Sequence, residues 1–276
     1  MVSQEQRRRQ LAREKFLRQQ QRRTSARRKE RMRNSVIASV LGVVVIGSVA
    51  LYTTGVLKND DDKASNASSD VTPSASAPTP SKAPDPCEKA AKGSVQKLSW
   101  KKEPAMTIDT SAKYTMKLAT TCGDIGIALK TSAAPHTANS FDFLAGKGYF
   151  DHTKCHRLTT NGIYVLQCGD PTGTGSGGPG YTIPDENLKD KSLKGNVYPA
   201  GTIAMANTGQ KHTGGSQFFL VYQDSQLPPS YTPFGTVDAA GMKVLKKIAA
   251  AGESTGQGDG APNATVVINK ATVTKS

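Results

Sequence analysis

An uncharged run of 23 residues, at positions 35–57, most constrains what this chain of 276 residues can fold into. The run is rich in Val, Ile and Leu. A helix of that length rises about 1.5 Å per residue and therefore crosses a hydrocarbon core of roughly 30 Å. Because lipid offers the backbone no hydrogen-bond partners, a helix is the structure available to such a segment in a membrane. The run therefore predicts a single transmembrane helix that divides the chain in two.

The charge on either side of this run sets the expected orientation. Residues 1–34 hold 13 Lys/Arg and 3 Asp/Glu, a net charge of +10, whereas residues 58–276 hold 23 and 19, a net charge of +4. Since basic flanks stay in the cytoplasm, we expect a single-pass protein of the cell membrane with its C-terminal part outside the cytoplasm. A cleaved signal peptide is the alternative, although the basic and apolar regions are both longer than those of a usual signal peptide.

The segments next to the apolar run have compositions of their own. The basic segment 1–34 is interpreted as a topology determinant near anionic lipid headgroups. Nucleic-acid binding is the alternative, but aromatic residues for base stacking do not alternate with the arginines, so no nucleic-acid partner is expected. In residues 58–86, 16 of 29 residues are Ser, Ala or Pro. Such a segment buries too little apolar surface to order itself, which predicts a disordered linker.

From residue 87 onwards the composition becomes that of a globular domain, predicted to span residues 87–276 with a core at about 105–274. Alternating apolar and polar residues predict a β-hairpin over 114–130, and helical spacing after a proline predicts a helix over 135–148. A second hairpin is expected from 154–158 and 163–167, and the glycine-rich run 173–180 is interpreted as a surface loop. Further strands are expected at 201–206, 217–222, 232–237 and 264–273, and a second helix at 239–251.

The four cysteines lie in the part expected outside the cytoplasm, where disulfides are permitted. Cys155 and Cys168 flank the second hairpin, so a cross-strand pair is plausible there and leaves Cys87 to pair with Cys122. Four free thiols remain an equal alternative. A zinc site at Cys155, His156 and Cys168 is a third interpretation, but the spacing typical of zinc ligands is absent.

Four short motifs follow one another within the predicted domain. They are CHRLTTNGIYVLQCGDP at 155–171, GTIAMANTG at 201–209, GGSQFFLVY at 214–222 and LPPSYTPFGTV at 227–237. Together they closely resemble the cyclophilin family of peptidyl-prolyl cis-trans isomerases, over about residues 114–273. The resemblance implies a mainly β fold, a closed eight-stranded antiparallel barrel capped by two α-helices, with an active groove on its outer face.

The resemblance also implies the residues of that groove. Arg157 matches the catalytic arginine of the family, and Gln167 matches the polar catalytic residue on the next strand. Gln226 stands where many members carry Trp, which implies weak cyclosporin binding. The implied substrate-binding residues are Tyr164, Val165, Ala206, Asn207, Thr208, Gln217, Phe219, Leu227 and Tyr231.

The predicted activity is rotation about X-Pro bonds in exported proteins, which assists their folding. Rotation makes and breaks no covalent bond, so we expect no cofactor or metal. Arg157 stays charged and can donate a hydrogen bond to the prolyl nitrogen as the amide twists. The expected partners are proline-containing polypeptides, bound by a monomeric catalytic domain. A chaperone or scaffold that binds proline segments with little turnover is the alternative.

Overall fold

The structure, a computed structural model, describes residues 84–276, which contain twelve short strands, two α-helices and one 3-10 turn. The helices are α2 (Pro135–Gly146) and α3 (Ala239–Ala250), and the turn is η1 (Lys194–Asn196). The strands are β1 (Tyr114–Thr120), β2 (Gly123–Leu129), β3 (Thr153–Lys154), β4 (Arg157–Thr159), β5 (Val165–Cys168), β6 (Val197–Tyr198), β7 (Thr202–Met205), β8 (Phe218–Val221), β9 (Ser225–Gln226), β10 (Pro233–Val237), β11 (Asp259–Gly260) and β12 (Val267–Lys275).

Ten of these strands form one antiparallel sheet in the order β11-β4-β5-β8-β7-β10-β2-β1-β12-β3, and β6 pairs separately with β9. Only two residues join β3, at one edge, to β4, next to the other edge. The sheet must therefore curl until its two edges approach each other. The predicted mainly β architecture with two helices is confirmed, but the eight-stranded closed barrel is observed as a curled sheet of ten strands. The two-residue pairings of β3 and β11 are too short to leave an alternating pattern in the sequence.

The first hairpin shows how the sequence directs the sheet. In β1 and β2, buried and exposed residues alternate, because successive side chains of a strand point to opposite faces. Thr120 ends β1, and its hydroxyl donates to the Gly123 carbonyl, which closes the turn between the strands. Gly123 has a φ of +128°, a conformation that side chains disfavour. The hairpin predicted over 114–130 is confirmed, as are the two predicted helices.

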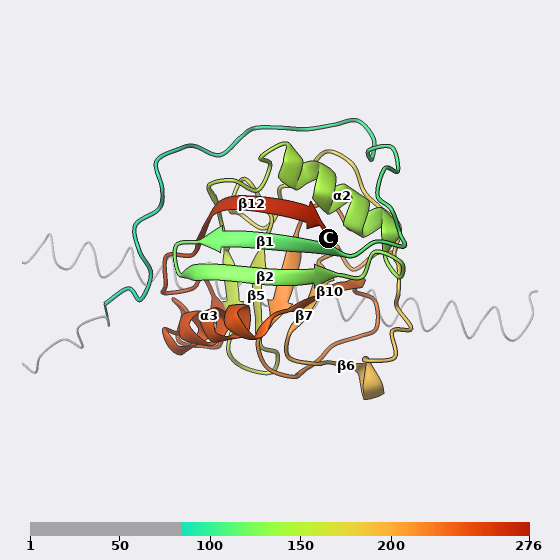
Figure 1. Cartoon of the computed structure of the whole chain (residues 1–276). Helices are drawn as coiled ribbons and strands as arrows, with labels where there is room; N and C mark the ends of the chain where they lie inside the picture. The colour runs from blue at the N-terminus through green and yellow to red at the C-terminus, as the bar shows by residue number, and fades with distance from the viewer. Residues whose placement is uncertain (1–83) are drawn as a thin grey trace, which may run out of the picture. The chain divides into compact units, whose positions relative to one another are not determined.

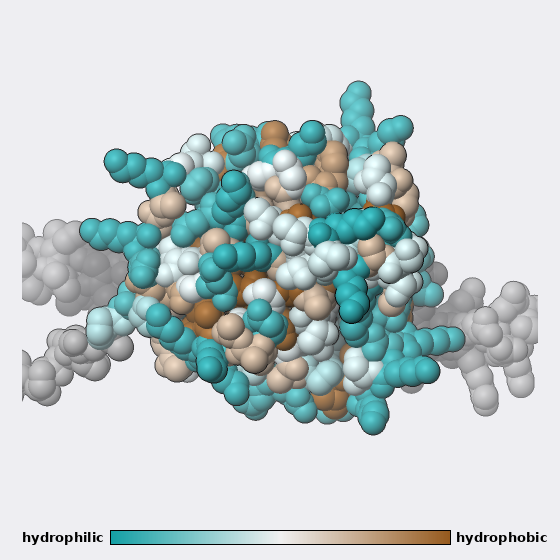
Figure 2. Space-filling model, viewed as in Figure 1, coloured by the Kyte–Doolittle hydropathy of each residue, from teal (hydrophilic) through white to brown (hydrophobic). Residues whose placement is uncertain are grey.

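The main core fills the inside of the curled sheet. Phe141 of α2 is fully buried against the rings of Phe150, Phe218 and Phe234. Helices α2 and α3 lie on opposite sides of β1, β2 and β12 (Figure 1). The surface in view in Figure 2 is mostly hydrophilic, and Met106 is the only exposed large hydrophobic residue in 84–276. The apolar side chains of the described domain are thus packed inside it.

An N-terminal strap, residues 84–113, precedes β1 and arches over the α2 side of the domain (Figure 1). Its first anchor is a disulfide from Cys87 to Cys122, in the turn of the first hairpin. Its second is Trp100, whose ring lies 5.0 Å from that of Phe143 and 5.9 Å from that of Tyr149. The strap is therefore a covalently tied part of the fold.

The predicted basic segment 1–34, the predicted transmembrane helix 35–57 and all but the last three residues of the predicted linker 58–86 lie outside the described residues. Within residues 84–276, no helix is long and apolar enough to span a bilayer.

Candidate active site

A row of side chains crosses four neighbouring strands on the outer face of the sheet. Arg157 of β4 lies opposite Gln167 of β5, which lies opposite Phe219 of β8, which lies opposite Ala204 of β7. Residues paired in this way share one face of the sheet. Phe218, the neighbour of Phe219, faces the other way and is fully buried in the main core. The row therefore places a guanidinium, an amide and an aromatic ring on the same outer surface.

The aromatic end of this row is a second, smaller hydrophobic cluster, separate from the main core. Phe219 is 5% exposed, and its ring meets that of Tyr231 edge to face at 5.4 Å. Tyr198 lies beneath them, and its hydroxyl donates to the Tyr231 carbonyl at 2.7 Å. Burial raises the pKa of Tyr198 to about 12, so its hydroxyl stays protonated. The cluster consists of Val165, Tyr198, Ala204, Phe219 and Val221, with Ile163, Leu193, Ala206, Leu227 and Tyr231 packed against it.

We call this cluster the slot, because its partly exposed members form an apolar surface directly beside the polar end of the row, Arg157 and Gln167. Leu227 and Tyr231, both predicted to bind substrate, pack against its buried residues. Tyr164 was expected there too, but the structure packs it against the main core, with its ring 5.9 Å from that of Tyr222. Its neighbour Ile163 lies against the slot instead. The cause is the strand alternation, which puts Tyr164 on the inner face and Val165 on the outer face.

The polar end of the row is a chain of hydrogen bonds centred on Arg157. The Nε and Nη2 atoms of Arg157 donate to the two carboxylate oxygens of Asp259, at 2.7 and 2.8 Å. Nη1 donates to Gln167 Oε1 at 3.2 Å. The hydrogen bonds with Asp259 raise the pKa of Arg157 and lower that of Asp259. Both groups are therefore charged at neutral pH.

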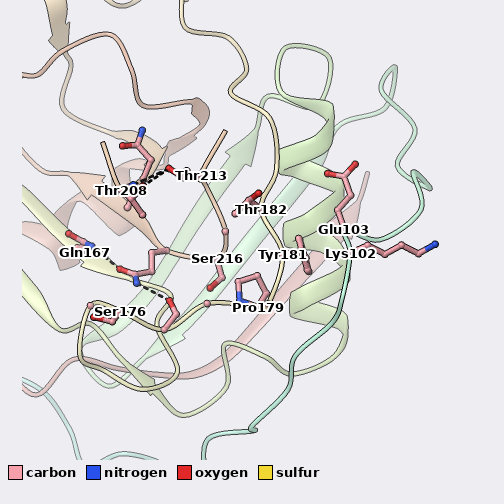
Figure 3. Close-up of a pocket in the computed structure, with 18 of the residues that line it drawn as sticks. Lys102, Glu103, Gln167, Ser176, Pro179, Tyr181, Thr182, Thr208, Thr213 and Ser216 are labelled. Carbon is pink, nitrogen blue, oxygen red and sulfur yellow. Dashed lines mark hydrogen bonds between the residues drawn. The ribbon is translucent and has the colours of Figure 1, made fainter. Parts of the chain in front are cut away.

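Gln167 continues the chain towards a glycine-rich loop. Its Nε2 donates to Gln217 Oε1 at 2.9 Å, and Gln217 Nε2 donates to the Gly177 carbonyl at 2.9 Å (Figure 3). Each amide thus has both its orientation and its donor direction fixed by a neighbour. Arg157 is held at one end of this chain and the loop at the other.

A cleft of about 1080 Å³ opens next to the slot, and Gln167, Ala206 and Gln217 belong to its wall. The glycine-rich loop 175–180 forms a second wall, and the strap contributes Lys101, Lys102 and Glu103 (Figure 3). The sequence interpretation of this loop as a surface loop missed its place beside the active groove. Composition alone carries no signal for that, because the loop reaches the cleft only through tertiary packing.

The segment that follows β7 supplies backbone groups at the rim of the cleft. The Ala206 N–H donates to the Gln217 carbonyl at 2.9 Å, and the Thr208 N–H donates to Thr213 Oγ1 at 3.1 Å. Between them, the main-chain N–H and C=O of Asn207 have no hydrogen-bond partner within residues 84–276. Its side-chain amide donates to the Ser230 carbonyl and so keeps the segment in place. An extended peptide can therefore pair with the free backbone groups of Asn207.

All four cysteines of the chain are paired, Cys87 with Cys122 and Cys155 with Cys168. The second disulfide lies next to the polar end of the row, because Cys155 lies two residues before Arg157 and Cys168 directly follows Gln167. Since these two sulfurs are bonded to each other, they are not available as zinc ligands. Residues 84–276 contain no cluster of His, Cys, Asp and Glu suited to a metal ion.

The site thus combines an apolar slot with a fixed guanidinium on the outer face of a curled sheet. The sequence model for cyclophilin-type peptidyl-prolyl cis-trans isomerases matches residues 115–273. The chain belongs to this family.

The curated relatives that the chain matches have names of the same enzyme class. The chain is 51% identical over 165 residues to the probable peptidyl-prolyl cis-trans isomerase B of Mycobacterium leprae, a match that covers 57% of this chain and 56% of the relative. The protein of the same description from Mycobacterium tuberculosis H37Rv is 47% identical, with 57% and 53% covered. The chain thus spans little more than half the length of these curated relatives.

Among solved structures, a cyclophilin-type peptidyl-prolyl cis-trans isomerase of Cryptosporidium parvum matches with a TM-score of 0.50. It is 27% identical, and the match covers 59% of this chain and 99% of that one.

Proposed function

We propose that this protein catalyses the cis–trans isomerisation of X-Pro peptide bonds. The observation that carries the proposal is the single row that places the Arg157 guanidinium and the Phe219 slot on one face of the sheet. Arg157 is also the only arginine in residues 84–276. A proline ring fits an apolar slot, and the free backbone groups of Asn207 hold the chain on one side of the bond.

The proposed reaction requires these residues to lower a rotational barrier, and no covalent bond is formed or broken. Amide resonance opposes rotation with a barrier of about 18–20 kcal/mol. As the bond twists, the prolyl nitrogen loses resonance and gains an available lone pair. A guanidinium that donates a hydrogen bond to this nitrogen, or holds the preceding carbonyl, stabilises the twisted form more than either planar form. Each 1.36 kcal/mol of such preference raises the rate about tenfold.

Exchange spectroscopy on a short Ala-Pro peptide tests the proposal with the full chain. We expect wild-type protein to produce cis–trans exchange, and Arg157→Ala to lower kcat/KM about a hundredfold, the usual loss for one transition-state donor. Arg157→Lys keeps the charge but not the planar fork and should recover only part of the activity. Lys117→Ala, on an exposed part of β1, is the control and should match wild type.

Two outcomes would redirect the interpretation. Peptide signals that shift on binding without any exchange between isomers would favour the scaffold alternative, in which the slot and the large cleft capture proline segments without turnover. A wild-type rate no faster than that of Arg157→Ala would refute the assigned role of the guanidinium.

For the whole protein we propose a bacterial, membrane-anchored isomerase that acts on exported polypeptides outside the cytoplasm as a monomeric domain. The uncharged run 35–57, with its basic flank, supports the anchor. The two disulfides suit an oxidising compartment. Membrane fractionation and protease treatment of intact cells test the anchor and its orientation. The protein should be found in the membrane fraction, and added protease should digest its C-terminal part in intact cells. Resistance to protease in intact but not in lysed cells would contradict it.

A further inference from the structure

The carboxylate of Asp259 contacts Arg157 from the side away from the slot. It comes from β11, 102 residues after Arg157 in the sequence. Its Cα lies opposite Thr159, which shares a face of β4 with Arg157, so Asp259 and Arg157 are diagonal neighbours. The two hydrogen bonds at 2.7 and 2.8 Å make a bidentate pair, in which a planar guanidinium matches a planar carboxylate.

The sheet order separates Asp259 from the slot. The strands β11, β4, β5 and β8 lie side by side in that order, and neighbouring strands are about 4.8 Å apart. Asp259 is therefore three strands away from Phe219, with Arg157 and Gln167 between them. The side chain through which Asp259 contacts the polar end of the row is Arg157.

The pair uses the donors of Arg157 in a defined way. A guanidinium has five N–H groups. Two go to Asp259 and one goes to Gln167, which leaves two for a substrate. The Arg157 side chain is 38% exposed, so without these contacts a long flexible side chain would sample several orientations.

The loop that carries Asp259 is itself braced. Glu253 accepts hydrogen bonds from the backbone N–H of Thr255 at 2.6 Å and of Gly258 at 2.8 Å. The Thr160 N–H donates to the Gly258 carbonyl at 2.9 Å, which ties the loop to the end of β4. The carboxylate of Asp259 is thus presented from a fixed backbone.

From this geometry we propose that Asp259 is a positioning residue, which fixes the plane of the Arg157 guanidinium and with it the direction of the two N–H groups that remain for a substrate. The inference rests on the proposed isomerase function. Removal of Asp259 leaves the charge of Arg157 in place but lets the side chain move. The twisted amide, which needs a donor in one direction, then loses more stabilisation than the bound planar substrate. The expected signature is a lower kcat with little change in KM.

The test compares Asp259→Ala, Asp259→Asn and Asp259→Glu in the full chain. We expect kcat to fall about tenfold for the Ala variant and somewhat less for Asn, which keeps one acceptor, with KM within twofold of wild type. Asp259→Glu should recover part of the rate because a carboxylate returns. The matched control is Asp124→Asn, which removes a carboxylate of similar exposure, 59% against 56% for Asp259, from its ion pair with Lys117 on the first hairpin and should leave kcat unchanged.

A second experiment distinguishes a loss of Arg157 positioning from general damage to the fold. In an Arg157→Ala background, Asp259→Ala should cause no further loss of kcat, since the group it positions is gone. Thermal midpoints should stay near wild type, because exposed ion pairs contribute little to stability. Unchanged kcat in Asp259→Ala, or an equal loss in both backgrounds, would overturn the inference while leaving the isomerase function standing. An inactive wild-type protein would instead refute the proposed function itself.

Discussion

Two adjacent residues directly before β5, Ile163 and Tyr164, separate binding from stability at the scale of single side chains. Ile163 packs against the slot, so Ile163→Ala should raise KM for a proline peptide about fivefold through lost apolar contact. Tyr164 packs on Tyr222, so Tyr164→Ala should lower the free energy of unfolding by about 2 kcal/mol and leave KM within twofold. Isomerase kinetics and urea unfolding of both variants provide the measurement. A larger KM effect for Tyr164→Ala would contradict the structure.

Single residues also show where sequence reasoning succeeds and where it stops. The opposite orientations of Phe218 and Phe219 follow from the period of a strand, and the structure has them. The same period places Tyr164 inside, but the family resemblance pointed to the slot. Asp259 was missed altogether. A diagonal contact between residues 102 positions apart is created by the sheet order, and no local pattern carries it.

At the scale of elements, the glycine-rich loop depends on one buried carboxylate. Asp170 accepts backbone hydrogen bonds from Thr172, Thr174, Gly175 and Gly177, at 2.7–3.1 Å. Burial raises the pKa of Asp170, but these hydrogen bonds outweigh it and lower the pKa to about 2. A carboxyl whose pKa is lowered by folding adds stability above its unfolded pKa, near 4, and loses it as the pH falls towards 2.

This linkage predicts that Asp170 contributes about 2 kcal/mol to the free energy of unfolding at pH 7, most of which is lost between about pH 4 and pH 2. Asp170→Asn should lower stability at neutral pH and should show a shallower loss across that acid range than wild type. Urea unfolding from pH 2 to 7 measures both curves. Parallel curves for the two proteins would show that Asp170 does not titrate in this way.

The disulfide between Cys155 and Cys168 should stabilise the element that carries the polar row. It closes a short loop, because its cysteines are 13 positions apart in the sequence, and for a loop of this size the chain-entropy estimate is about 3 kcal/mol. We expect a Cys155→Ala/Cys168→Ala double variant to lose about that much free energy of unfolding. We also expect faster amide exchange in β4 and β5. Exchange rates that rise equally in all strands would indicate a general loss and no local effect.

The elements differ in how well the sequence predicts them. The first hairpin and both helices have long periodic patterns or a proline at the first turn, so local chemistry specifies them. The strands β3 and β11 have two residues each and exist only because a distant strand pairs with them. The hairpin made the Cys155–Cys168 pair one of the alternatives that the sequence left open, whereas the place of the glycine-rich loop beside the cleft does not follow from any local feature.

At the scale of the whole molecule, the strap and the body of the domain should unfold together. Trp100 is the only tryptophan in the chain, so tryptophan fluorescence reports directly on strap docking. In wild type we expect the fluorescence and circular dichroism transitions to coincide in urea. In a Cys87→Ala/Cys122→Ala variant, which frees the start of the strap, fluorescence should change at lower urea. An early fluorescence transition already in wild type would mean that the strap is a separate unit.

The inner face of the sheet contributes to stability, and the outer face carries the slot. Side chains that turn inward from β5 and β8, such as Leu166 and Leu220, hold the domain together, while those that turn outward, such as Val165 and Phe219, shape the recognition surface. Mutation can therefore alter the outward set while the inward packing keeps its shape. Substitutions in the outward set can therefore be used to seek new selectivity, for instance towards hydroxylated or otherwise ring-modified prolines, without a redesign of the interior.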